Sequence, residues 1–249
     1  MSRPTVVVSP RELRQERIEL DGEAFRHLFR ARRLGAGAGL RLVDGRGAAR
    51  WAEVDSVGRR RAGIALGDEA PPNEAPVAVE LWVGVPRPRR AAWLVEKATE
   101  VGITALRWLD TAHSGRTVPE PALERHRRIA VAAVEQSSRA LVPEISGLHP
   151  LSDLVAALEP KTPTLVLDRR APTVPPGEAP DAAAWRRAGA VRVVVGPEGG
   201  LRAEEIEELE SAGAKRLRLG ERVLRVETAA VVAAGVVLWS VGGGAFSEL

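Results

Sequence analysis

Short runs of β-branched and other apolar residues predict that the first seventy residues form a strand-rich unit. Strands are expected at residues 3–9, 40–43, 51–57 and 62–66. The segment 23–33 instead places Phe25, Leu28 and Phe29 at helical spacing. Asp-Gly-Arg-Gly at residues 44–47 separates two of the strand runs and predicts a β-hairpin. Several short strands with one helix predict a small β-barrel domain over residues 1–70.

The pattern changes after residues 71–76, a polar, proline-containing stretch that predicts a linker. Beyond it, unbroken apolar runs alternate with segments of helical periodicity. Strands are expected at 77–83, 103–109, 164–167, 191–195 and 216–219, and helices at 91–101, 122–139, 202–212 and 228–241. This alternation is typical of an α/β domain, here residues 77–249, with a mostly parallel sheet covered by helices on both faces.

The last predicted helix, 228–241, carries apolar residues on all sides. It is therefore expected to be buried, either in the core or against another subunit. Thr228 is its expected N-cap, because the threonine hydroxyl can accept a backbone N–H of the first turn.

Arginine dominates the charge of the 249-residue chain, whose 36 basic and 33 acidic side chains leave a net charge of +3. Only three of the basic residues are lysine, and residues 1–70 hold 14 arginines against 10 carboxylates. Guanidinium groups suit phosphates and base edges, so this excess predicts a nucleic-acid partner. Codon bias in a GC-rich genome is the alternative explanation.

Several functional classes are disfavoured by what the sequence lacks. Without cysteine there are no disulfides, zinc–thiolate sites or thiol nucleophiles. The four histidines lack metal-ligand spacing, and no P-loop, HExxH or GxSxG motif occurs, so no metal is expected. No signal segment or membrane-length apolar run is present either, which predicts a cytoplasmic protein without a membrane partner.

A glycine-rich loop follows one of the predicted strands. Gly-Pro-Glu-Gly-Gly at residues 196–200 precedes a predicted helix, which is the place where open α/β sheets bind nucleotide-like ligands. Gly199 and Gly200 would let backbone amides approach a ligand, although an ordinary left-handed turn explains them equally well. The glutamates of the next helix argue against a polyphosphate ligand.

Two further polar segments carry candidate chemistry. Residues 217–230 lead from a strand into the last helix and include Arg225 and Glu227, which are two positions apart and so do not share a helix face. A surface salt bridge between them is the simpler interpretation. The cluster Glu135, Gln136 and Arg139 ends a predicted helix and is typical of a solvated helix terminus.

Taken in order, these segments resemble the bacterial small-subunit ribosomal RNA uridine N3-methyltransferase family of the knotted SPOUT superfamily. The matching motifs are the 196–200 loop, Leu219-Gly220, Val223-Leu224-Arg225, Glu227-Thr228-Ala229, Glu135-Gln136 with Arg139, Val142-Pro143-Glu144-Ile145, and Lys97 with Glu100 and Gly102. Leu28, Arg32-Arg33-Leu34, Gly39 and Asp44-Gly45 resemble the family's PUA-like RNA-binding domain. Two places depart from the family pattern: Val226 stands at a usual threonine, and Pro86-Arg87-Pro88 replaces a usual Lys-Gly stretch.

The resemblance implies a PUA-like β-barrel followed by an α/β domain with a deep trefoil knot, a feature that periodicity cannot indicate. It implies S-adenosyl-L-methionine as cofactor, 16S rRNA in the small ribosomal subunit as substrate, and a homodimer. The implied cofactor residues are Leu167, Gly196, Pro197, Glu198, Gly199, Gly200, Leu217, Leu219, Gly220, Val223 and Leu224. The implied RNA-binding residues are Arg30, Arg32, Arg33, Gln136 and Arg139.

Methylation of uracil N3 requires loss of a weakly acidic proton, which leaves negative charge on O2 and O4. Arg225 is the candidate to stabilise that anion, and Glu227 or Glu198 to orient groups or act as the base. Two alternatives stay open: a related ribose 2′-O-methyltransferase, and a non-enzymatic dimeric rRNA-binding assembly factor.

Overall fold

A computed structural model describes residues 3–158, 161–172 and 182–242. The chain divides into two units by its internal contacts. The first unit is Met1–Glu74 together with Val131–Val142, and the second is Ala75–Ala130 together with Pro143–Leu249. We describe each unit by itself.

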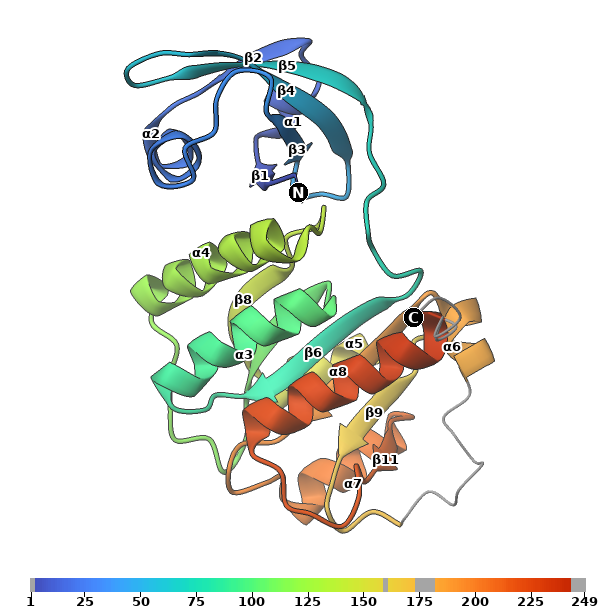
Figure 1. Cartoon of the computed structure of the whole chain (residues 1–249). Helices are drawn as coiled ribbons and strands as arrows, with labels where there is room; N and C mark the ends of the chain where they lie inside the picture. The colour runs from blue at the N-terminus through green and yellow to red at the C-terminus, as the bar shows by residue number, and fades with distance from the viewer. Residues whose placement is uncertain (1–2, 159–160, 173–181, 243–249) are drawn as a thin grey trace. The chain divides into compact units, whose positions relative to one another are not determined.

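The first unit contains one five-stranded sheet in the order β1-β3-β4-β5-β2 (Figure 1). Its strands are β1 (Thr5–Val7), β2 (Arg17–Leu20), β3 (Gly39–Val43), β4 (Ala49–Val57) and β5 (Ala62–Glu69). Only β1 and β3 pair in parallel. The predicted hairpin between β3 and β4 is confirmed, and the Asp44 carboxylate shapes its turn by accepting the N–H groups of Arg46 and Ala48.

The helical segment of the first unit begins as α2 (Gly22–Phe25) and continues as the π-helix η1 (Arg26–Ala31). Phe25, Leu28 and Phe29 are buried, as their spacing predicts, and they join the apolar core of the sheet. A shorter helix, α1 (Pro10–Leu13), starts in a capping box in which Ser9 and Glu12 bond one another's backbone N–H groups.

The C-terminal end of α4 (Glu120–Ser137) belongs to the first unit. Val134 and Ala140 pack in a buried cluster with Val43, Ala49 and Ala70. The core of this unit is therefore built from two separate stretches of sequence.

A buried ion pair holds the turn after α4. The Arg139 side chain is only 4% exposed, and its Nη2 lies 2.7 Å from the Glu74 carboxylate. Glu74 also accepts the N–H groups of Ala140 and Leu141 at 2.9 Å. The expectation of a solvated helix terminus is wrong for Arg139, because a carboxylate from the stretch predicted as a linker meets it.

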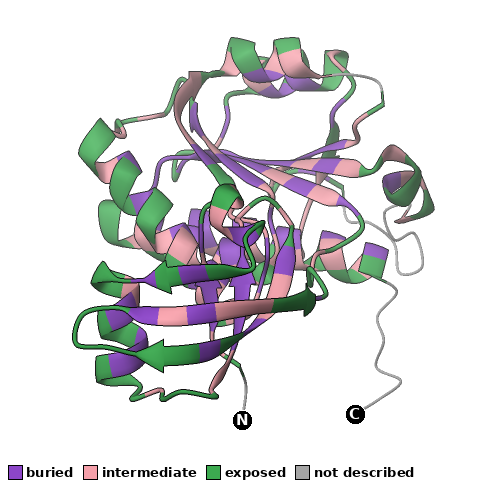
Figure 2. Cartoon of the chain, turned by 90° about the horizontal axis from the view of Figure 1, so that it is seen from above, coloured by how far each residue is buried: buried purple, intermediate pink, exposed green. Residues whose placement is uncertain are grey.

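The second unit is built on a six-stranded, wholly parallel sheet in the order β11-β9-β10-β6-β7-β8. Its strands are β6 (Ala78–Gly84), β7 (Ala105–Asp110), β8 (Glu144–Pro150), β9 (Thr164–Leu167), β10 (Ala190–Val195) and β11 (Lys215–Leu217). The central strands are mainly buried (Figure 2), as expected of a sheet covered on both faces.

Helices cover the two faces of this sheet. The chain forms α3 (Pro88–Val101), α5 (Leu151–Ala157), α6 (Ala182–Ala188), α7 (Ala203–Ser211) and α8 (Val226–Gly242) besides α4. Helices α3, α6 and α8 pack together on one face, while α5 and α7 share a core with Trp82, Val166 and Val194 on the other. Within the described part of the chain, no helix is long and apolar enough to cross a membrane.

Helix α8 starts at Val226, so Thr228 lies inside the first turn and the prediction of Thr228 as N-cap is wrong. The helix was expected to be buried in the core or against another subunit. In the single chain one side of it is buried, while Val232, Val236 and Trp239 are 42%, 39% and 62% exposed.

Candidate functional site

Three neighbouring strands end at the same level of the parallel sheet. Leu167, the last residue of β9, is in register with Val195 at the end of β10 and with Leu217 at the end of β11. The Asp168 N–H donates to the Leu217 carbonyl oxygen at 3.1 Å, which ties two of the following loops at their origin. All three loops of the implied cofactor site therefore leave one edge of the sheet, where ligands bind in open α/β folds.

The 196–200 loop passes unusually close to the end of β6. A Cβ atom added to Gly84 would lie 2.4 Å from the Pro197 nitrogen, and one added to Gly196 would lie 3.0 Å from the Leu201 nitrogen. Neither position has room for a side chain, since backbone atoms stand in the way. Nothing in the sequence indicates a role for Gly84, because a single glycine at the end of a strand is common.

Open space adjoins other glycines of the same loops. Gly200 and Gly220 have φ of 74° and 117°, and an added Cβ would meet nothing within 4 Å at either position. The left-handed turn foreseen as an alternative is thus present at Gly200. These two glycines combine a backbone shape that excludes most side chains with unfilled space beside them.

The loop after β7 contacts the 196–200 loop, and the sequence analysis missed it. The Arg116 Nη1 lies 2.8 Å from the Glu198 carboxylate, and His113 Nδ1 lies 3.1 Å from the Gly200 carbonyl oxygen. Glu205 of α7 accepts the N–H of Ala112 at 2.7 Å. Glu205 therefore connects the start of α7 to the loop after β7, which accounts for one of the several glutamates of this helix.

Arg225, the last residue before α8, and Glu227, in the first turn of α8, do not form the mutual salt bridge considered from the sequence. Glu227 is buried and lies 3.4 Å from Arg90 of α3, and its second oxygen, Oε2, has no hydrogen-bond partner among the residues that the structure describes. Glu221, a carboxylate of the loop between β11 and α8, pairs with Arg218, whose Nη2 lies 2.7 Å from Glu221 Oε1. Arg225 is exposed and pairs with no carboxylate in the described part of the chain. The salt-bridge interpretation of Arg225 is therefore wrong.

The remaining side chains implied for the cofactor loops differ in exposure. Pro197 is buried, Leu167, Leu217, Leu219 and Leu224 are half-buried, and Val223 is 77% exposed. Exposed apolar residues beside glycines with open space offer an apolar surface next to backbone donors and acceptors, which is typical of small-ligand sites.

The residues implied in RNA binding are all in the first unit. Arg30, Arg32 and Arg33 are exposed at the end of η1, and Gln136 is exposed on α4. Arg139 is buried against Glu74, so we assign it a role in stabilising this unit and not in contacting RNA. No group of three or more His, Cys, Asp or Glu side chains placed to hold a metal occurs in residues 3–158, 161–172 and 182–242.

Both units of the chain match known protein families. Residues 73–238 match the family described as an RNA methyltransferase domain, and residues 20–64 match the RNA methyltransferase PUA domain. The Mycobacterium bovis protein named ribosomal RNA small subunit methyltransferase E is 34% identical over 228 residues, covering 88% of this chain and 84% of that protein.

Solved structures agree in fold. The Neisseria gonorrhoeae ribosomal RNA small subunit methyltransferase E, bound to S-adenosyl methionine, aligns with a TM-score of 0.83 at 24% identity, over 94% of this chain and 95% of that one. A probable rRNA-methyltransferase from Porphyromonas gingivalis aligns with a TM-score of 0.78 at 26% identity, over 96% and 98% of the two chains.

The parallel sheet with its three loops at one edge, and the domain match that spans it, define an RNA methyltransferase with an attached PUA domain. Within that class the chain belongs to the ribosomal RNA small subunit methyltransferase E family. The resemblance carried by the sequence motifs is thereby confirmed.

Proposed function

We propose that the protein transfers a methyl group from S-adenosyl-L-methionine to N3 of a uridine in 16S rRNA. The observation that carries the proposal is the register of Leu167, Val195 and Leu217, which brings three family-typical loops to one sheet edge. The small ribosomal subunit is the substrate particle, and the cytoplasm, where that particle is made, is the place of action.

The cofactor would be held mainly by backbone groups of these loops. Its residues are Leu167, Gly196, Pro197, Glu198, Gly199, Gly200, Leu217, Leu219, Gly220, Val223 and Leu224. The open space beside Gly200 and Gly220 fits a bound small molecule, and the half-buried leucines fit an adenine ring. When bound, the sulfonium supplies an activated methyl group and its own leaving group.

The protein must supply the acid–base chemistry at uracil. Arg225 is exposed and without a carboxylate partner among the described residues, so its guanidinium is available for the anion that develops on O2 and O4. Glu198 is exposed beside Arg116 and is our candidate base. Glu227 is buried against Arg90, which suits a positioning residue that fixes the start of α8.

The working protein is a homodimer in this proposal. Val232, Val236 and Trp239 form one stripe along α8, and Trp93 and Val101 are exposed on α3, which packs beside it (Figure 1). Gly235 lies between Val232 and Val236 in this stretch of α8, and a Cβ added to it would lie 3.9 Å from Val101 Cγ1 of α3. The two helices therefore share this apolar surface. A second copy would bury it.

The finer fold is also part of the proposal. We expect a deep trefoil knot in the second unit, consistent with a sheet in which β10 lies between β9 and β6 while the later β11 adds beside β9. We expect the first unit to act as a PUA-like barrel that binds RNA through Arg30, Arg32, Arg33 and Gln136.

The test is methyl transfer from a labelled cofactor to naked 16S rRNA and to assembled small subunits, with the modified nucleoside identified by mass spectrometry. The proposal expects 3-methyluridine. A ribose-methylated nucleoside would establish the 2′-O alternative, and cofactor binding without any product would point to an assembly factor.

A further inference from the structure

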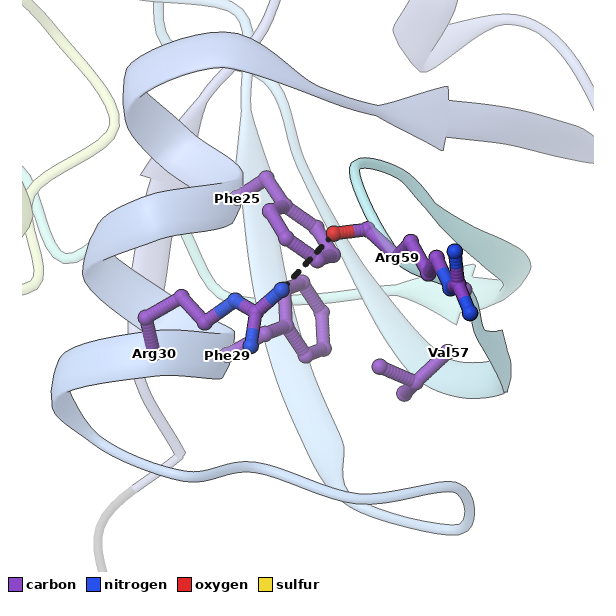
Figure 3. A pocket seen from close by; sticks show the side chains of 6 residues that line it. Phe25, Phe29, Arg30, Val57 and Arg59 are labelled. Atoms are coloured by element: carbon purple, nitrogen blue, oxygen red, sulfur yellow. Dashed lines mark hydrogen bonds between the residues drawn. The ribbon is translucent and has the colours of Figure 1, made fainter.

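A pocket opens in the first unit between η1 and the turn that joins β4 to β5 (Figure 3). Its volume is about 360 Å³, and it is lined by Phe25, Phe29, Arg30, Val57, Gly58 and Arg59. It lies within one unit and takes no residue from the methyl-transfer loops.

The floor of the pocket is aromatic. The rings of Phe25 and Phe29 stack with centroids 5.2 Å apart and an angle of 29° between their planes. Both side chains are packed in the core of the unit, at 4% and 7% exposure, so only a small part of each ring reaches the pocket. Val57, at the rim, is 42% exposed, which leaves apolar surface open to solvent.

One wall is a guanidinium group that is held in place before any ligand arrives. Arg30 Cζ lies 5.9 Å from the centre of the Phe25 ring, and its Nη2 donates to the Arg59 carbonyl oxygen at 2.9 Å (Figure 3). A fixed guanidinium plane is a stacking surface for a nucleobase, and it keeps further N–H donors for phosphate or base oxygens.

The opposite wall carries three arginines, of which one is paired with a carboxylate. The turn presents Arg59, Arg60 and Arg61 in succession, closed by the bond from the Gly58 N–H to the Arg61 carbonyl oxygen at 2.9 Å. Arg61 pairs with Glu19 at 3.1 Å. In the described part of the chain, neither Arg59 nor Arg60 pairs with a carboxylate, so both are available to an anionic ligand.

We infer that this pocket binds one unpaired nucleotide of an RNA, a site that deepens the proposed RNA binding of the first unit. The base would lie against the exposed Arg30 guanidinium plane and Val57, over the small part of the Phe25 and Phe29 rings that reaches the pocket, while its phosphates face Arg59 and Arg60. A guanidinium plane beside apolar surface favours splayed single-stranded bases over a duplex, whose bases are already stacked. An acidic peptide has the negative charge of RNA but no flat base to stack on the guanidinium plane.

The experiment uses the full chain and fluorescence anisotropy with a labelled oligouridine of about eight nucleotides. Arg59→Glu is the test variant and Arg14→Glu, exposed on another part of the same unit, is the control with the same change in charge. Arg59→Glu should weaken binding at least about tenfold, because it places a carboxylate at the phosphate position. Arg14→Glu should weaken it less than about threefold.

Equal losses in the two variants would overturn the pocket, since only the general charge of the unit would then matter. Equal or tighter binding of a duplex, or of a polyglutamate peptide, would overturn the unpaired nucleotide as ligand. Val57→Asp, which places a charge at the rim without touching the arginines, gives a second variant and should weaken oligouridine binding as Arg59→Glu does.

The position can be mapped directly with 4-thiouridine in the same oligomer. Crosslinks are expected in the tryptic peptides that contain Phe29 or Val57, and crosslinks confined to other peptides would refute the site. Cofactor binding, measured by calorimetry in Arg59→Glu, should be unchanged. Failure of methyl transfer in the wild-type protein would refute the proposed function and leave this binding result standing.

Discussion

Gly84→Ala is the substitution for which the structure makes the sharpest prediction. Gly84 ends β6, and an added Cβ would lie 2.4 Å from the Pro197 nitrogen and 2.7 Å from its Cα. Ordinary contacts begin about 1 Å farther out, and both atoms are backbone, so no side-chain rotation relieves the clash. The 196–200 loop must therefore move.

The expected magnitude follows from that displacement. Overpacking a rigid interior typically costs about 1–3 kcal/mol of stability. A shift of about 1 Å in a positioning loop typically lowers a rate by about 100-fold. We expect Gly84→Ala to fold, to unfold at lower urea concentration, and to bind S-adenosyl-L-methionine at least about tenfold more weakly.

The matched control is Gly147→Ala in β8, a strand of the same sheet. There an added Cβ would meet only Leu123 Cδ2 at 3.9 Å, an ordinary contact. Urea titration and calorimetry of both variants give the comparison. If Gly84→Ala keeps wild-type cofactor affinity, the closeness of β6 to the 196–200 loop does not govern the site, and the reasoning fails.

Three further outcomes follow from the structure. Arg225→Ala should slow single-turnover methyl transfer at least about tenfold with cofactor affinity nearly unchanged, and a wild-type rate would remove Arg225 from the chemistry. Burial, and then the charge of Arg125, lower the pKa of His126 below its usual value, so the folded chain takes up this proton at a lower pH than the unfolded chain, which does so below about pH 6.5. Stability should therefore fall as the pH drops below that value, by at most about 1.4 kcal/mol per pH unit from this group, and His126→Phe should remove that part of the pH dependence in urea titrations. Glu74→Gln should cost about 3–5 kcal/mol, because Arg139 is left buried without its carboxylate, and an unchanged melting temperature would contradict this.

Long apolar runs and strong turn signals were enough to predict most of the fold. The hairpin at Asp44 and the buried strands β6, β9 and β10 were predicted because each carries a dense local pattern. Strand β2 (Arg-Ile-Glu-Leu) has only two apolar residues between charged ones, and β8 carries a glycine and a proline at the sheet edge, so neither stands out from a loop. Strand order was likewise out of reach, since parallel neighbours such as β9 and β10 are joined by contacts far apart in sequence.

The candidate site, too, was predicted only where a local sequence pattern marks it. The 196–200 loop and the 217–224 loop were found from their glycines and from the family motifs. Gly84 and Arg116 were not, because their importance lies in proximity: one has no space for a side chain, and the other reaches Glu198 across two loops. The pairing of Glu227 also needed the structure, since its partner, Arg90, comes from α3, more than a hundred residues earlier in the chain.

The two-stretch core of the first unit has a consequence for how the chain matures. Val134 and Ala140 complete a cluster begun by Val43, Ala49 and Ala70, so this unit lacks part of its interior until residue 142 has been synthesised. At ordinary elongation rates that interval lasts roughly 3–14 s after residue 74. During this time the emerging sheet keeps an apolar patch that the end of α4 will later cover. A fragment ending at residue 74 would carry the same patch permanently, so isolated N-terminal fragments should aggregate where the full-length chain does not.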